Sequence, residues 1–135
     1  MNKTLLALIF TIILVQVIKV IILYIKKREF QIKYLTKTGG MPSSHSALVV
    51  SLVTSIFLLE GFTSTFTIAL VLALIVMRDA FGVRRTVGEE TAILKKLLRK
   101  NRIKTILHEA EGHTPYQVTI GAIIGLLITL VIFFF

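Results

Sequence analysis

The sequence predicts an all-α integral membrane protein, a polytopic bundle of about four transmembrane helices with one amphipathic helix on the cytoplasmic side. Hydrophobic residues make up 55% of the chain and charged residues only 17%, and the mean hydropathy is +0.85. A soluble domain of 135 residues does not carry this proportion of apolar side chains. The length leaves room for a single domain, residues 1–135.

Four apolar segments are long enough to cross or nearly cross a bilayer, which requires about 20 helical residues. The first is expected to be a retained helix and not a signal peptide, because its apolar run continues past Gln16 and Lys19 and no small-residue cleavage site follows. Lys19 is expected to extend toward the lipid headgroups. The second segment is short, so we expect it to begin below the membrane surface or to tilt little. The segments are Thr4–Ile25, Ser46–Leu59, Ser64–Phe81 and Tyr116–Phe135.

Positive charge is concentrated in two parts of the chain. Of the sixteen Lys and Arg residues, five lie in 26–40 and nine in 78–115. Cationic residues next to membrane spans stay in the cytoplasm, so both parts should face it, with the two chain ends and the 60–63 turn outside. The net charge of +9 is thus explained by topology and anionic lipid, and no nucleic-acid partner is expected. We expect the plasma membrane of a bacterium, with the active site facing the cytoplasm.

An amphipathic helix is predicted within "EETAILKKLLRKNRIKTI", residues 89–106. Apolar side chains occupy one side of this helix and cations the other. We expect it to lie along the cytoplasmic leaflet, as a surface anchor or as a gate for a lipid. The apolar side is formed by Ile93, Leu94, Leu97 and Leu98.

The stretch "GGMPSSHSALVV", residues 39–50, joins a turn to an apolar helix. Pro42 suits a helix start, and Ser43 or Ser44 can cap the free amides of the first turn. These amides, at the positive end of the helix dipole, form an anion site. Capping explains the serines but not His45, whose imidazole can donate a proton at neutral pH.

A second histidine precedes the last apolar segment, in "EGHTPYQVTIGAIIG", residues 111–125. Pro115 opens this helix, and His113 stands just ahead of it on the same side of the membrane as His45. Gly121 and Gly125 form a small-residue face for close helix packing, and we expect this face and the exposed apolar surface to drive a homo-oligomer.

A zinc site at "HEAEGH", residues 108–113, is not expected. His108 and His113 are five residues apart where a helical zinc motif needs four, and Gly112 and Pro115 interrupt the helix. We therefore expect neither a metal nor a cofactor.

Taken together, "GGMPSSHSA", "GHTPYQVTIGAIIG" and "RDAFGVRR" resemble the divergent branch of the type 2 phosphatidic acid phosphatases, whose superfamily includes the vanadium haloperoxidases. The resemblance covers about residues 33–125. Residues 42–45 match the Pro-Ser-Gly-His motif with Ser in place of Gly. His113, with Val118 and Gly121 after it, matches the motif that carries the nucleophilic histidine.

The chain departs from the usual family pattern near His113. Gln117 occupies the position of the carboxylate that follows the nucleophile, and Leu107 occupies that of an arginine. An amide oxygen can hold the imidazole in one tautomer but cannot stabilise its cation as a carboxylate does. Three alternatives follow: Asp79 or Glu111 supplies the missing charge from another direction, the enzyme is slow, or the protein is no phosphatase.

The resemblance implies hydrolysis of a membrane lipid phosphate monoester through a phosphohistidine, with phosphate or vanadate as the site ligand. His113 would attack phosphorus and His45 would protonate the leaving alkoxide, with no metal required. Arg78, Arg84 and Arg85 are placed to replace the absent family arginine. The implied catalytic residues are His113, His45, Asp79 and Gln117, and the implied phosphate-binding residues are Ser43, Ser44, Arg78, Arg84, Arg85, Lys33 and Lys37.

Two other function classes stay open from the sequence. A non-catalytic phospholipid- or anion-binding membrane protein would keep the histidine site but lose turnover through Gln117. A small transporter would use the paired helix starts to bind a travelling anion. Release of phosphate from lipid phosphates separates the enzyme from both.

Overall fold

The part of the chain that the structure describes is helical, as the sequence predicts. The computed structural model describes residues 2–28, 40–103, 105 and 112–135. The expected membrane segments agree with four of its helices to within two residues at either end. The helices are α1 (Lys3–Lys27), α3 (Ser44–Glu60), α4 (Ser64–Phe81), α5 (Val83–Lys100) and α6 (Pro115–Phe134).

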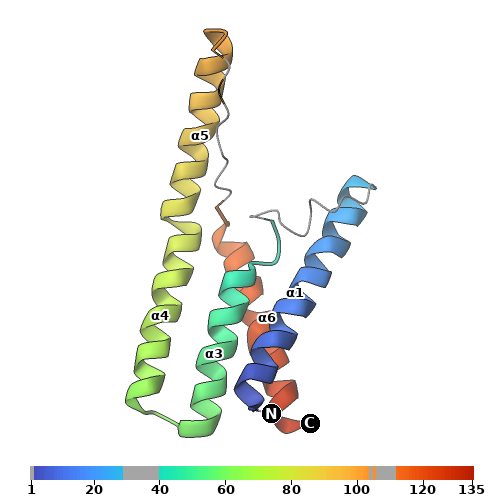
Figure 1. Cartoon of the computed structure of the whole chain (residues 1–135), viewed down its shortest axis with the longest axis vertical. Coiled ribbons are helices and arrows are strands. Elements are labelled where there is room, and N and C mark those ends of the chain that lie inside the picture. The colour runs from blue at the N-terminus through green and yellow to red at the C-terminus, as the bar shows by residue number, and fades with distance from the viewer. Residues whose placement is uncertain (1, 29–39, 104, 106–111) are drawn as a thin grey trace.

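The start of α3, the end of α4 and the start of α6 lie at the same end of the bundle (Figure 1). Both chain ends and the turn between α3 and α4 lie at the opposite end. The start of α3, the end of α4 and the start of α6 therefore meet, as the charge distribution predicts. This arrangement brings the two histidine-containing stretches to the same end of the molecule.

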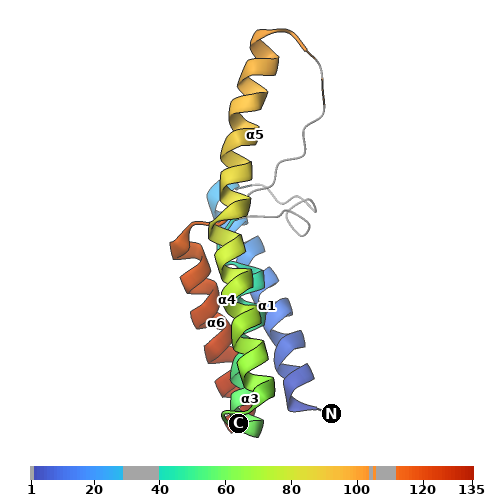
Figure 2. The same cartoon turned by 90° about the vertical axis from the view of Figure 1, so that its left-hand side faces the viewer.

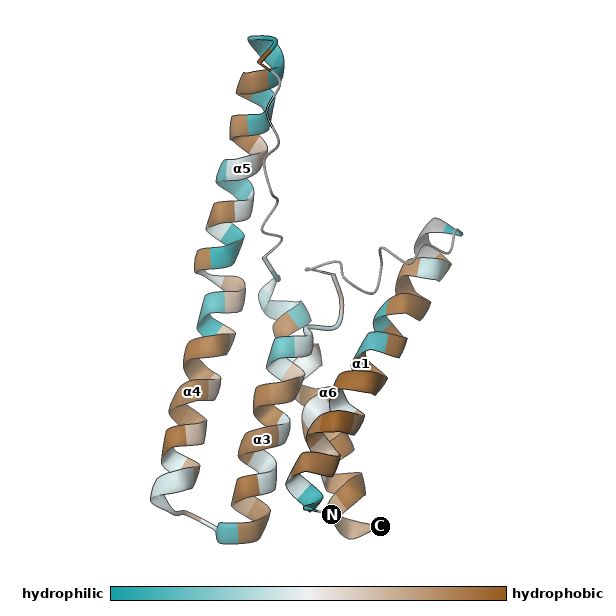
Figure 3. Ribbon diagram, in the orientation of Figure 1, coloured by the Kyte–Doolittle hydropathy of each residue, from teal (hydrophilic) through white to brown (hydrophobic). Residues whose placement is uncertain are grey.

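The outer surface of the bundle is that of a membrane protein. Helices α1, α4 and α6 are long and apolar enough to span a bilayer, whereas α3 is a shorter apolar helix of 17 residues. At 1.5 Å per residue α3 is about 26 Å long, slightly less than the hydrocarbon core. Apolar residues predominate along these helices, while α5 alternates between polar and apolar residues (Figure 3). The prediction of a helical membrane bundle is confirmed.

Small and hydroxyl-bearing residues form the interior of the bundle. Ser51 of α3 is fully buried, and its Oγ accepts hydrogen bonds from Thr11 of α1 (3.2 Å) and Thr129 of α6 (2.7 Å). Small side chains allow membrane helices to approach closely, and hydroxyl groups bond across the contacts. Ser51 thus connects α1, α3 and α6 at one level of the bundle.

Gly121 and Gly125 pack α6 directly against the backbone of α3. A Cβ atom on Gly121 would overlap the carbonyl of Ser43, and one on Gly125 would overlap the carbonyl of Ala47. The predicted close packing is confirmed, but its partner is α3 of the same chain and not a second copy. The glycine face is therefore occupied within the chain and is not available to a second copy. The homo-oligomer stays a prediction, but this face does not support it.

Helix α5 does not lie across the end of the bundle, contrary to the expectation. It begins at Val83, six residues before the predicted start, and projects along the line of α4 (Figures 1 and 2). Only Gly82 separates the two helices. The Gly82 amide donates to Arg78 O (2.9 Å), and the Thr86 amide donates to Gly82 O (3.1 Å). Because these bonds have helical spacing, they keep α5 in line with α4.

Replacing Gly125 by Val should destabilise the fold, because the added Cβ collides with backbone that cannot move aside. We expect a loss of about 1–3 kcal/mol or more in the free energy of unfolding. Leu127→Val is the matched control, because Leu127 lies on the same helix with 55% of its surface exposed. Thermal unfolding in mild detergent, followed by circular dichroism, measures both. Equal midpoints for the two variants would contradict the α3–α6 contact.

Candidate functional site

Two backbone hydrogen bonds tie together the three helix ends at the polar end of the bundle. The Ser43 amide, at the start of α3, donates to the carbonyl of Gln117 in α6 (3.3 Å). The His113 amide, just before α6, donates to the carbonyl of Ala80 in α4 (2.9 Å). These bonds fix the positions of both predicted histidine stretches relative to α4.

Ser43 is used to start α3. Its Oγ accepts hydrogen bonds from the Ser46 amide (3.4 Å) and the Ser46 hydroxyl (2.8 Å), and its side chain is fully buried. Its amide is already bonded to the carbonyl of Gln117 and is not free to bind an anion. Ser44 and His45 form the first turn, whose amides the helix itself leaves without partners.

A capping box at the start of α6 orients His113. The Gln117 amide donates to Thr114 Oγ1 (3.3 Å), and Gln117 Oε1 accepts from the Thr114 amide (3.1 Å). The same Oε1 lies 3.3 Å from His113 Nδ1. The atom of Gln117 that meets the Thr114 N–H must be its oxygen, and an oxygen can only accept, so Nδ1 carries the proton. In the neutral ring the lone pair is therefore on Nε2.

His113 is buried, with 6% of its surface exposed. Burial lowers the pKa of its imidazole below the ordinary histidine value. The hydrogen bond to Gln117 opposes this change, as does one to the backbone of Gly40, whereas the charges of Lys19 and His45 lower the pKa further. Among the described residues, these groups act on His113, and none is a carboxylate. A lowered pKa keeps the ring neutral at neutral pH, with its lone pair available.

His45 is exposed to solvent, and its charge is among those that act on His113. Arg84 Nε and Asp79 Oδ2 form an ion pair of 2.7 Å, and both charges act on His45. The carboxylate of Asp79 therefore acts on His45 and is not among the groups that act on His113. From the sequence we expected Asp79 or Glu111 to replace the missing carboxylate beside His113. Both members of the pair are about half exposed, so its contribution to stability is small.

Two of the predicted phosphate ligands, Arg78 and Arg85, do not act on the histidines. Arg78 is exposed, with its guanidinium carbon 5.6 Å from the centre of the Phe81 ring. Arg85 pairs with Glu89 (3.0 Å). Neither arginine is among the charges that act on His45 or His113. Lys33, Lys37, Leu107, His108 and Glu111 lie outside the described residues.

Lys19 is the site residue that the sequence analysis missed. It does not extend to the headgroups as expected but is buried, with 5% of its surface exposed. It continues the buried face of α1, which carries Ala7, Thr11 and Val15 at intervals of four residues. Its Cε lies 3.7 Å from the place that a Cβ on Gly40 would take, and its charge acts on both His45 and His113. The four-residue interval from Ala7 was the signal that could have placed it.

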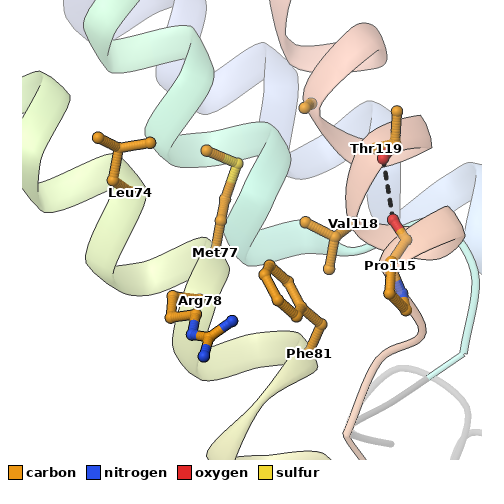
Figure 4. A pocket seen from close by; sticks show the side chains of 8 residues that line it. Leu74, Met77, Arg78, Phe81, Pro115, Val118 and Thr119 are labelled. Atoms are coloured by element: carbon orange, nitrogen blue, oxygen red, sulfur yellow. Dashed lines mark hydrogen bonds between the residues drawn. The ribbon is translucent and has the colours of Figure 1, made fainter.

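An apolar groove of about 500 Å³ lies between α4 and α6. Arg78 is its cationic residue, and its α6 wall begins at Pro115, two residues after His113 (Figure 4). A groove of this kind suits a hydrocarbon chain whose polar end stays near the helix ends. Its lining consists of Leu74, Met77, Arg78, Phe81, Pro115, Val118, Thr119 and Ala122.

Gln117→Glu should raise the pKa of His113. A carboxylate that accepts the Nδ1–H bond stabilises the imidazolium, so protonation should occur at a pH higher by about one unit or more. The control is Tyr116→Glu, which adds the same charge at a position that is 68% exposed. NMR titration of histidine-labelled protein resolves the three histidines. Equal changes in both variants, or a wild-type His113 that titrates above the ordinary value, would contradict the geometry.

Comparison with known proteins agrees with the resemblance in the motifs. The profile of the Divergent PAP2 family matches residues 1–128 and so extends beyond the stretch that the motifs cover. The chain is 39% identical over 152 residues to the "Uncharacterized membrane protein YuiD" of Bacillus subtilis (strain 168), with 99% of this chain and 96% of that protein covered. No solved structure matches the chain. This membrane protein therefore belongs to the divergent PAP2 family.

Proposed function

We propose that the protein is a lipid phosphate phosphatase that hydrolyses a phosphate monoester at the cytoplasmic face of the membrane. The observation that carries this proposal is the pair of histidines at two adjoining helix starts, one buried with its lone pair on Nε2 and one exposed. A nucleophile must be unprotonated and a general acid must exchange protons with water, and these two environments suit those roles. Membership of the divergent PAP2 family supports the same chemistry.

In the proposed reaction, Nε2 of His113 attacks phosphorus and the bond between phosphorus and the ester oxygen breaks. His45 gives its proton to the departing alkoxide, which leaves as an alcohol. Water then attacks the phosphohistidine, with His45 as the base, and releases inorganic phosphate and free His113. Protons and charge balance without a metal or an external cofactor.

Gln117 orients the imidazole of His113, a role that a carboxylate has in the usual family members. Its oxygen accepts from Nδ1 and so leaves Nε2 as the reacting atom. It adds no negative charge to stabilise the imidazolium-like state that forms during attack. The lowered pKa of His113 keeps the ring in its neutral form, which can attack, but it also disfavours the cation that forms during attack.

Two features support a charged phosphate at this place, and a third supports its location in the cytoplasm. The first-turn amides of α3 at Ser44 and His45 provide fixed dipoles for an anion. The charge of Arg84 acts on His45, and the same charge can stabilise the phosphoryl oxygens. Cations outnumber acidic residues in the parts of the chain next to this end of the bundle, which supports a cytoplasmic location.

The apolar groove between α4 and α6 supports a lipid as the substrate. Its lining is mostly apolar and includes Arg78 of α4 and Pro115 of α6, and Pro115 is two residues after His113. A lipid with one chain in this groove would hold its phosphate near the helix ends. A water-soluble phosphate ester would gain nothing from this surface.

Substitution of the two histidines should have different effects. His113→Ala removes the atom that bonds to phosphorus, so turnover and any acid-labile phosphoenzyme should be lost. His45→Ala should slow hydrolysis of an alkyl phosphate by roughly 10²–10⁴-fold, but should affect a nitrophenyl phosphate much less, because nitrophenolate leaves without a proton. His108→Ala, at the remaining histidine, is the matched control and should retain activity. Phosphate release by purified protein in detergent measures all three.

The binding class gives the opposite pattern. A non-catalytic phospholipid-binding protein would release no phosphate from either ester, and this result would refute the phosphatase. Full activity in His113→Ala would equally refute the proposed mechanism.

A further inference from the structure

Lys19 is a buried cation within an apolar helix that spans the membrane. The other lysines of α1 are Lys3, Lys26 and Lys27, which all lie at its ends. Placing a charged lysine inside the bilayer costs free energy, and such residues usually face the protein interior, where they serve a function. A lysine that only anchored α1 would extend its ammonium group to the headgroups.

The packing of α1 directs Lys19 toward the histidines. It follows Ala7, Thr11 and Val15 on the face that contacts the rest of the bundle. Its side chain reaches the turn at Gly40 that leads into α3. The same face carries Gln16, whose Oε1 is buried, so two polar side chains of α1 point inward near this level.

The position of Lys19 completes a cationic site around the start of α3. His113 approaches from α6, His45 belongs to the first turn of α3, and Lys19 arrives from α1. The positive end of the α3 dipole is directed to the same place. A phosphate group between the histidines would therefore meet the ammonium group and the first-turn amides together.

We infer that Lys19 is the residue that anchors the phosphate group of the ligand at this site. Lys33 and Lys37, which we expected to bind the phosphate, follow α1 in the chain, but α1 itself supplies a cation. This inference rests on the proposed function for the identity of the ligand. An ammonium group binds phosphate as a point charge, so the role needs positive charge at this position more than a particular geometry.

Binding of orthovanadate to the purified full-length protein, followed by ⁵¹V NMR, tests the inference without turnover. Lys19→Met keeps the length of the side chain but removes the charge, and should weaken binding by roughly 10- to 100-fold, the range for a lost hydrogen bond to a charged group. Lys19→Arg should restore most of the affinity. Lys3→Met is the control, because Lys3 lies at the far end of the same helix and is exposed. In turnover, Lys19→Met should raise KM for a lipid phosphate more than it lowers kcat.

The outcomes separate this inference from the proposed function. Vanadate affinity that depends on Lys19 in a protein without hydrolysis would support the anion site and refute the phosphatase. Wild-type affinity in folded Lys19→Met would overturn the role of Lys19, even in an active enzyme. A wild-type protein that binds no vanadate would overturn it as well. Lys19→Gln repeats the comparison if Lys19→Met does not give a monodisperse helical protein.

Discussion

The close packing of α6 on α3 is the contact on which the site depends. Gly121 and Gly125 let α6 approach until its backbone touches the carbonyls of Ser43 and Ala47. Only at this separation can the Ser43 amide reach the carbonyl of Gln117 and join the two helix starts. A larger residue on α6 would separate the first turns of the two helices, and the two histidines with them. Small residues in the membrane thus control the geometry of polar groups at its surface.

The tautomer and the charge state of His113 are set by different parts of the structure. The capping box fixes the Gln117 oxygen, and that oxygen fixes the proton on Nδ1. Burial and the Lys19 charge then favour the neutral ring, while solvent exposure leaves His45 free to exchange protons. Local helix capping therefore sets the tautomer, and the tertiary fold sets the charge state. Neither needs a carboxylate beside His113.

The sequence predicted the parts of this arrangement that depend on local patterns. Apolar length located α1, α4 and α6 and the shorter α3, and Pro, Ser and Thr residues located the starts of α3 and α6. It did not predict the direction of α5, because one glycine can either bend or continue a helix and the hydrogen bonds around Gly82 decide. It placed Lys19 wrongly, since a lysine in an apolar helix can point to either side until the neighbours of that helix are known. For the same reason the sequence could not predict that Arg84 acts on His45 whereas Arg78 lines the groove.

The central claim is that Gln117 leaves Nε2 of His113 as the atom that reacts with phosphorus. The most direct measurement is the identity of the phosphorylated nitrogen in protein quenched during turnover of a lipid phosphate, determined by ³¹P–¹⁵N NMR on histidine-labelled enzyme. The account predicts an acid-labile phosphoryl group on Nε2 of His113 in the wild type, and none in His113→Ala. A phosphoryl group on Nδ1 or on His45, or hydrolysis without any phosphohistidine, would contradict it.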